Sequence, residues 1–242
     1  MPVRIYRAES AAVQPACVYF HGGGWTMGRL DHYDVLCSHI AKESRWTVIS
    51  LDYRLAPEQK FPVPVFDCRT ALLAVVAQAA ELRIDSTRIA VAGDSAGGNL
   101  AAVVGLLARD YGVSLAGQIL IYPVVDYVSN RESYGFDYLL GREDMVAFWN
   151  YYLHHPSDAE SPLAAPLRAG SFAGLAKTLI LTAEFDPLRD EGEAYGQRLK
   201  EAGVDTTTSR YPGMIHGFVN LGGAIPQGRK AILEITQWLK DL

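Results

Sequence analysis

The chain has 242 residues, of which 49% are hydrophobic and 20% are charged, and its formal net charge is −5. This composition is typical of a globular protein with a well-buried core, and the acidic balance without a basic stripe argues against nucleic acid or an anionic membrane as a partner. No N-terminal stretch resembles a signal peptide, and no run approaches the roughly 20 apolar residues of a membrane span. The three cysteines, Cys17, Cys37 and Cys68, show neither metal-ligand nor disulfide spacing. We therefore expect a cytoplasmic protein without a metal site.

Strand-like and helix-like segments alternate along the chain. Short apolar runs indicate buried strands, and longer segments with apolar residues on one face indicate helices. The predicted strands are 3–7, 16–20, 47–51, 88–92, 118–122, 178–182 and 206–211. The predicted helices are 32–43, 65–82, 96–110, 189–202 and 228–242. This alternation predicts an α/β fold, with a mainly parallel sheet and helices on both of its faces.

The stretch from about 126 to 174 interrupts the alternation. It is rich in aromatic residues and holds one short amphipathic helix, predicted over 145–153. We interpret it as a cap-like insertion over the carboxyl edge of the sheet, where such folds bind ligands. A long surface excursion packed by its own aromatic residues is the alternative. Residues 1–242 then form a single domain with this insertion.

A candidate nucleophile lies in the run Gly93-Asp94-Ser95-Ala96-Gly97, between the strand 88–92 and the helix 96–110. A G-x-S-x-G run is a weak signal by itself because glycine and serine are common in turns. In a strand-turn-helix context it is typical of a sharp turn that exposes the serine hydroxyl above the sheet. We predict Ser95 as the nucleophile and expect Asp94 to brace the turn.

A serine hydroxyl needs a base to take its proton, and the base needs a carboxylate to hold its tautomer. Asp186 follows the strand 178–182 and His216 follows the strand 206–211. Both therefore belong to the sheet edge that presents Ser95, in the chain order serine, acid, histidine. We predict His216 as the base and Asp186 as the acid, with Glu184 as the second candidate for the acid.

The glycine run His21-Gly22-Gly23-Gly24-Trp25 follows the strand 16–20. The oxyanion of an acyl-transfer reaction must meet preorganised N–H donors, and glycine lets the backbone approach the substrate closely. We predict the N–H groups of Gly23, Gly24 and Ala96 as an oxyanion hole. An ordinary glycine turn is the alternative. A phosphate-binding loop is disfavoured, because neither Gly-Lys-Ser/Thr nor G-x-G-x-x-G is present.

Taken together, the motifs resemble the hormone-sensitive-lipase-like branch of the α/β-hydrolases, also called the bacterial family IV esterases. They are HGGGW at 21–25, DYRLAPE at 52–58, GDSAGGNL at 93–100, SPLAAPL at 161–167, DPLRDEG at 186–192 and HGF at 216–218. The resemblance implies a serine carboxylesterase that hydrolyses short- to medium-chain acyl esters through an acyl-enzyme. It assigns Ser95, Asp186 and His216 as the triad, and it implies no metal or organic cofactor.

One departure from the family is large. Family members carry several tens of residues before the glycine loop, whereas 20 residues precede His21 in this sequence. We therefore expect the chain to lack the N-terminal half of the cap. An exposed apolar patch near the site and a free sheet edge would follow, and both favour a homo-oligomer.

Two other functions stay open beside the esterase. The same triad would serve an amidase or deacetylase acting on aryl amides, carbamates or acetylated small molecules. A non-catalytic receptor for a small ligand on this fold is disfavoured because the chain keeps His216.

Overall fold

The computed structural model describes residues 1–8 and 12–242, and within them seven strands form one sheet in the order β1-β3-β2-β4-β5-β6-β7. β1 pairs antiparallel with β3, and the other neighbouring pairs are parallel. The strands are β1 (Val3–Tyr6), β2 (Gln14–Phe20), β3 (Thr47–Leu51), β4 (Ile84–Asp94), β5 (Gly117–Ile121), β6 (Thr178–Phe185) and β7 (Thr206–Ile215). The predicted α/β class with a mostly parallel sheet is confirmed.

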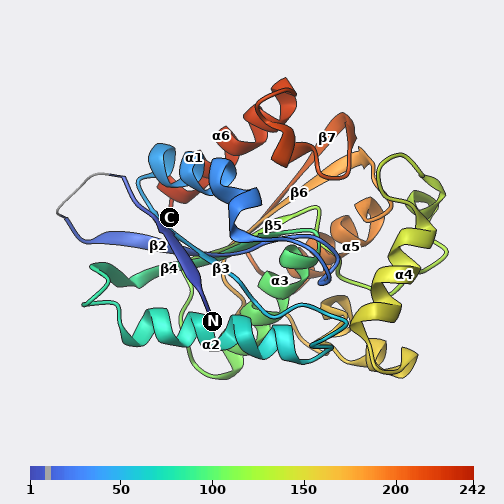
Figure 1. Cartoon of the computed structure of the whole chain (residues 1–242), viewed down its shortest axis with the longest axis horizontal. Coiled ribbons are helices and arrows are strands. Elements are labelled where there is room, and N and C mark those ends of the chain that lie inside the picture. Colours follow the sequence, from blue (N-terminus) through green and yellow to red (C-terminus); the bar gives the residue numbers. More distant parts are fainter. Residues whose placement is uncertain (9–11) are drawn as a thin grey trace.

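Helices cover both faces of the sheet (Figure 1). α1 (Asp34–Ser44) and α6 (Pro226–Lys240) pack against each other on one face. α2 (Val63–Ala77) and α3 (Ala96–Asp110) pack together on the other face, where α5 (Arg189–Glu201) lies against β6 and β7. Each layer of helices closes one of the two hydrophobic clusters that flank the sheet.

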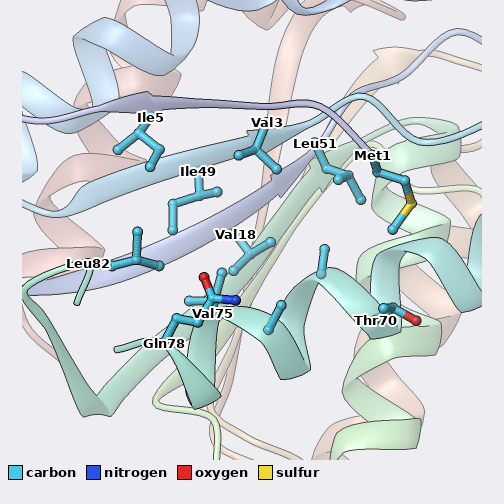
Figure 2. Close-up of a pocket in the computed structure, with 12 residues that line it drawn as sticks. Met1, Val3, Ile5, Val18, Ile49, Leu51, Thr70, Val75, Gln78 and Leu82 are labelled. Carbon is cyan, nitrogen blue, oxygen red and sulfur yellow. The ribbon is translucent and has the colours of Figure 1, made fainter. Parts of the chain in front are cut away.

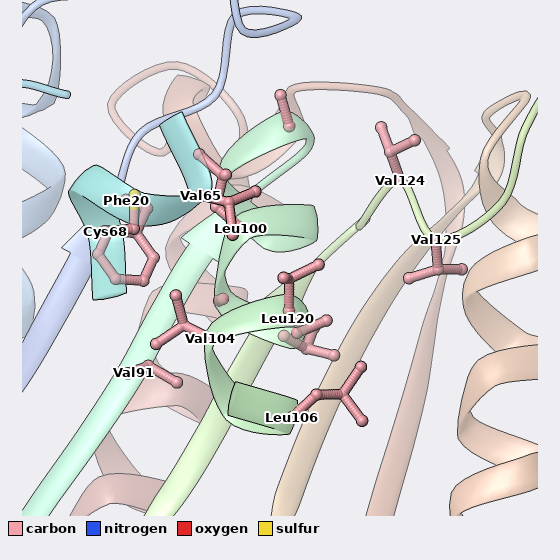
Figure 3. Close-up of a cluster of buried hydrophobic side chains, with 14 of the residues drawn as sticks. Phe20, Val65, Cys68, Val91, Leu100, Val104, Leu106, Leu120, Val124 and Val125 are labelled. Atoms are coloured by element: carbon pink, nitrogen blue, oxygen red, sulfur yellow. The ribbon is translucent and has the colours of Figure 1, made fainter. Parts of the chain in front are cut away.

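The middle of the sheet is buried from both sides. Every residue of β2 and β3 is buried, as expected for parallel strands covered by helices on both faces. Figure 3 shows Leu100 and Val104 of α3 among Val91 of β4 and Leu120 of β5, and all four side chains belong to one cluster. This packing fixes the start of α3 against the carboxyl ends of the central strands.

Several strands run further than the sequence predicts, among them β4, β6 and β7. β6 extends to Phe185 and β7 to Ile215, because their pairing resumes between these two residues after an irregularity at Ala183. Asp186 therefore follows Phe185 and His216 follows Ile215, and these two preceding residues pair across β6 and β7.

The helix predicted over 65–82 ends earlier, at Ala77. Ala79 and Ile84 are buried, and the N–H of Ile84 donates to the carbonyl of Ala79, which turns the chain into β4. Tertiary burial therefore outweighs the helix propensity of this alanine-rich stretch.

The stretch 126–174, all of which the structure describes, contains no strand. It holds α4 (Arg142–Tyr152) and three short 3₁₀ helices, η2 (Glu132–Gly135), η3 (Pro156–Glu160) and η4 (Pro166–Arg168). α4 begins three residues before the predicted helix, where the carboxylate of Asp144 accepts the N–H of Gly141 and caps the first turn.

A buried carboxylate of α5 anchors the beginning of this insertion. Glu191 is fully buried, and its Oε1 accepts the N–H groups of Val125 and Asp126 at 2.9 and 3.2 Å. Its Oε2 accepts the hydroxyl of Tyr134 in η2 at 2.9 Å. Burial raises the pKa of Glu191 to about 8, although these hydrogen bonds lower it.

This pKa predicts how stability depends on pH. The pKa in the folded protein lies above the ordinary value of 4.5, so the contribution of Glu191 to the free energy of unfolding is present in full below pH 4.5. It is lost as the pH rises toward 8. A glutamine keeps an acceptor for both N–H groups and cannot ionise. Thermal unfolding from pH 5 to pH 9 should therefore show Glu191→Gln gaining stability relative to the wild type, with each kcal/mol moving Tm by about 2–4 °C.

Glu193→Gln is the matched control on the same helix. Although burial raises the pKa of Glu193, hydrogen bonds from Arg210 and Thr182 lower it on balance. Its contribution to stability is lost at acidic pH, so its difference from the wild type should stay constant between pH 5 and pH 9. A constant difference for Glu191→Gln over the same range would contradict the prediction.

Candidate active site

Ser95 lies on the turn between β4 and α3 in a strained backbone conformation, with φ 55° and ψ −119°. Its N–H donates to the carbonyl of Ile121 at 2.8 Å, and its carbonyl accepts the N–H of Val124 at 3.2 Å. A Cβ on Gly97 would collide with the carbonyl oxygens of Phe20 and His21 at the end of β2, so only glycine fits there. The neighbouring strands thus hold the serine on its turn.

The structure brings the three predicted triad residues into one hydrogen-bonded chain. Nε2 of His216 lies 2.9 Å from Oγ of Ser95, and Nδ1 of His216 lies 2.7 Å from Oδ2 of Asp186. Asp186 is fully buried, and its Oδ1 accepts the N–H of Leu188 at 2.9 Å. Because a carboxylate only accepts, Nδ1 of His216 carries the proton toward Asp186 and leaves Nε2 free to accept from Ser95.

Glu184, the second candidate for the acid, and the nearby Asp190 are engaged elsewhere. Oε2 of Glu184 accepts the N–H of Gly213 at 2.6 Å, in the segment that leads to His216. Oδ2 of Asp190 accepts the N–H of Ser133 at 2.9 Å. Both carboxylates bond to backbone in neighbouring segments, and Asp186 is the carboxylate that contacts the imidazole of His216.

The glycine loop follows β2, whose last residue, Phe20, pairs with Gly93 just before the turn that carries Ser95. Gly23 and Gly24 have φ values of +111° and +58°, and the carbonyl of Gly23 accepts the N–H groups of Thr26 and Met27. Among the residues that the structure describes, no acceptor pairs with the N–H of Gly23, Gly24 or Ala96. These three groups are therefore available to an oxyanion.

His21 orients this loop. Its ring is fully buried, stacks on Tyr53 with centroids 4.3 Å apart, and places Nδ1 2.8 Å from the carbonyl oxygen of Gly22. Burial lowers the pKa of His21, which favours the neutral ring. The neutral ring then donates from Nδ1 to Gly22 and fixes the turn that precedes Gly23.

Helix α4 packs directly on the glycine loop. Trp25 stacks on Tyr152 of α4 with centroids 4.2 Å apart and an interplanar angle of 4°, and it contacts Trp149 at 4.7 Å. The ring of Phe148, also on α4, packs against the backbone of Gly24. Aromatic side chains of α4 therefore support the glycine loop.

Exposed apolar side chains also lie beside Asp186 and His216. Tyr138 and Leu139 are 66% and 64% exposed. Tyr138 packs on Phe185, which precedes Asp186, and Leu139 lies against Gly217, which follows His216. The segment between η2 and α4 therefore places apolar surface beside the candidate triad.

A second apolar surface lies at the β1 edge of the sheet, between the strands and α2. A pocket of about 300 Å³ opens between α2 and the strands β1, β3 and β2, as Figure 2 shows. Val3, Ile5, Ile49, Leu51 and Val75 are among its lining residues, and none of the residues that line it belongs to the candidate triad or to the glycine loop. It is separate from the site around Ser95.

No group of three or more histidine, cysteine, aspartate or glutamate side chains in 1–8 and 12–242 is arranged to hold a metal ion. Cys17, Cys37 and Cys68 are free thiols and are buried. Over the same residues, every helix is too short or too polar to cross a membrane.

Comparison with known proteins places the chain in a family. The family model for the alpha/beta hydrolase fold matches residues 17–220. The chain is 39% identical to an arylesterase of Saccharolobus solfataricus, over all of this chain and 79% of the relative. It is 37% identical to an ethyl acetate hydrolase of Pseudomonas putida, over all of this chain and 78% of the relative.

The fold is also similar to that of a solved esterase structure. An esterase of Pyrobaculum calidifontis superposes with a TM-score of 0.96 at 43% identity, over 99% of this chain and 80% of that one. The chain therefore belongs to the α/β-hydrolase fold family, in the hormone-sensitive-lipase-like branch that its motifs indicate.

Proposed function

We propose that this protein is a serine carboxylesterase that hydrolyses short- to medium-chain acyl esters through an acyl-enzyme. The observation that carries the proposal is the chain from Asp186 through His216 to Ser95, with contacts of 2.7 and 2.9 Å, next to the unpaired N–H groups of the glycine loop. The names of its relatives, an arylesterase and an ethyl acetate hydrolase, support the same reaction class. The small-molecule ester is the partner that this site would take, and the buried free thiols fit a cytoplasmic location.

The geometry suits acylation. As Oγ of Ser95 attacks the ester carbonyl carbon, Nε2 of His216 takes the hydroxyl proton, and the buried carboxylate of Asp186 stabilises the imidazolium. The carbonyl oxygen becomes an oxyanion, which the N–H groups of Gly23, Gly24 and Ala96 would receive. When the tetrahedral intermediate collapses, His216 gives its proton to the departing alkoxide.

Deacylation repeats these steps with water. His216 takes a proton from the water as the oxygen attacks the acyl-enzyme, and the same donors hold the second oxyanion. The acid is released when the bond to Oγ breaks and His216 returns the proton to Ser95. The packing of Phe148 on Gly24 fills space above the oxyanion loop, and this favours a short acyl chain.

Replacing the nucleophile tests the reaction. Ser95→Ala should lower kcat for p-nitrophenyl butyrate by about 10⁴-fold or more, because hydrolysis would retain only the oxyanion donors and substrate binding. Ser38→Ala is the control, since Ser38 is an exposed residue of α1 whose hydroxyl bonds only within its own helix. Hydrolysis by Ser95→Ala at the wild-type rate would refute the assignment.

A substrate series tests the acyl preference. Along p-nitrophenyl esters from acetate to laurate, kcat/KM should peak among the short chains and decline for the long ones. Phe148→Ala should move the peak toward longer chains, because it removes the ring that packs on Gly24. An aryl amide such as p-nitroacetanilide belongs in the same series. A kcat/KM for the amide above that of every ester would favour the amidase instead.

We further propose that the protein self-associates through the edge of the sheet at β1. In the described residues, no strand pairs with the outer side of β1, and Val3 and Ile5 on this strand are 48% and 44% exposed. An edge strand with exposed apolar residues is prone to pair with a second copy. Sedimentation at micromolar concentration should therefore show an oligomer, and Ile5→Lys should shift it to monomer with the esterase activity kept. A monomeric wild type would contradict this part of the proposal.

A further inference from the structure

We propose that Asp94, the residue before the nucleophile, is a positioning residue that sets the oxyanion loop against Ser95 and ties both to the segment carrying His216. The inference rests on the proposed esterase function. It concerns a side chain that takes no part in the proton transfers described above.

The carboxylate of Asp94 accepts hydrogen bonds from four donor groups. Asp94 is 3% exposed and ends β4. Its Oδ1 accepts the hydroxyl of Tyr19 and the N–H of Gly22, each at 2.9 Å. Its Oδ2 accepts the hydroxyl of Tyr33 at 3.0 Å and the side-chain N–H of Asn220 at 3.1 Å. One side chain therefore joins β2, the glycine loop, the 3₁₀ turn before α1 and the turn after His216.

The contact to Gly22 bears directly on the oxyanion donors. Gly22 precedes Gly23, and its N–H meets both Oδ1 of Asp94 and the hydroxyl of Tyr33, which lies 2.9 Å away. A Cβ on Gly22 would stand 2.6 Å from Oδ2 of Asp94, so the loop backbone lies directly on the carboxylate. A displacement of about 1 Å in such a loop can cost about 10²-fold in rate, because the donors then miss the oxyanion.

The contact to Asn220 extends the coupling to the base. Asn220 lies in η5 (Phe218–Leu221), the 3₁₀ turn that follows His216 and Gly217. Its Nδ2 donates to the oxygen of Asp94 that also accepts from Tyr33. Asp94 thus contacts the segment that follows the base as well as the loop that carries the oxyanion donors.

Alanine and asparagine at this position separate the contacts of the carboxylate. Ionised aspartate accepts on both oxygens, whereas asparagine accepts on one and donates on the other. In the Asp94→Asn variant the amide oxygen can face the N–H of Gly22, and the amide of Asn220 can turn over to accept from the new N–H₂. Asp94→Ala leaves the N–H of Gly22 without this acceptor and removes the link to Asn220.

This difference allows a rescue experiment with p-nitrophenyl butyrate. Asp94→Ala should lower kcat by about 10²-fold with little change in KM, because the oxyanion donors act mainly in the transition state. Asp94→Asn should keep most of kcat, because its amide oxygen still accepts from Gly22. Asn220→Asp should lower kcat, because it sets two carboxylates against each other. The double variant, Asp94→Asn with Asn220→Asp, should recover most of this loss, because the amide at position 94 can donate to the new carboxylate at position 220.

Asp85→Asn is the matched control. Asp85 is a carboxylate near the start of β4, the strand that Asp94 ends, and its oxygens bond to Thr87 and Arg88. It should lower Tm and leave kcat of the folded enzyme unchanged. If Asp94→Ala does not fold, Tyr33→Phe tests the same contact. It removes a hydroxyl that bridges Gly22 and Asp94, and it should lower kcat without raising KM.

The outcomes separate the two proposals. A wild type without esterase activity would overturn the proposed function. An active wild type whose Asp94→Ala variant loses only Tm and keeps kcat, or a double variant no more active than Asn220→Asp, would overturn the positioning role. A Tyr33→Phe variant with unchanged kcat would overturn it as well. Rescue of kcat in the double variant supports it, since a purely structural contact would restore Tm without changing kcat of the folded enzyme.

Discussion

The register between neighbouring parallel strands determines where the reacting groups meet. Phe20 of β2 pairs with Gly93 of β4, so the glycine loop leaves the sheet beside the turn that carries Ser95. Phe185 of β6 pairs with Ile215 of β7. The residues that follow them, Asp186 and His216, therefore leave the sheet side by side. Parallel strands end at the same edge of a sheet, and this edge is where the fold can gather side chains from distant parts of the chain.

A strained turn can persist at that edge because the surrounding packing overdetermines it. The conformation of Ser95 costs of order 1–3 kcal/mol. Fully burying one leucine or valine contributes about 1.5–3 kcal/mol. Leu100 and Val104 are fully buried in the first turns of α3. A few such side chains offset the strain, and the turn holds the serine hydroxyl in place before any substrate arrives.

The local pattern placed Ser95, Asp186 and His216 a few positions after short apolar strands, and the structure brings these three side chains into contact. The pattern was not sufficient to predict what holds them. The extension of β6 and β7 depends on pairing between Phe185 and Ile215, 30 residues apart, and no periodicity in either segment signals it. The hydrogen bond from Val125 to Glu191 joins residues 66 positions apart, and the bond from Asn220 to Asp94 joins residues 126 positions apart. No local pattern in a single sequence indicates such distant contacts.

The glycine loop is held from two opposite sides, and the two sides have different chemistry. A carboxylate, Asp94, binds the backbone of Gly22 from the sheet, whereas α4 packs Phe148 on Gly24 and Tyr152 on Trp25 from the insertion. The proposed oxyanion donors therefore share their support with α4. Because packed side chains transmit small displacements, a change in α4 also moves these N–H groups. Under the proposed function, a substitution in α4 that changes chain-length selectivity would therefore also change turnover.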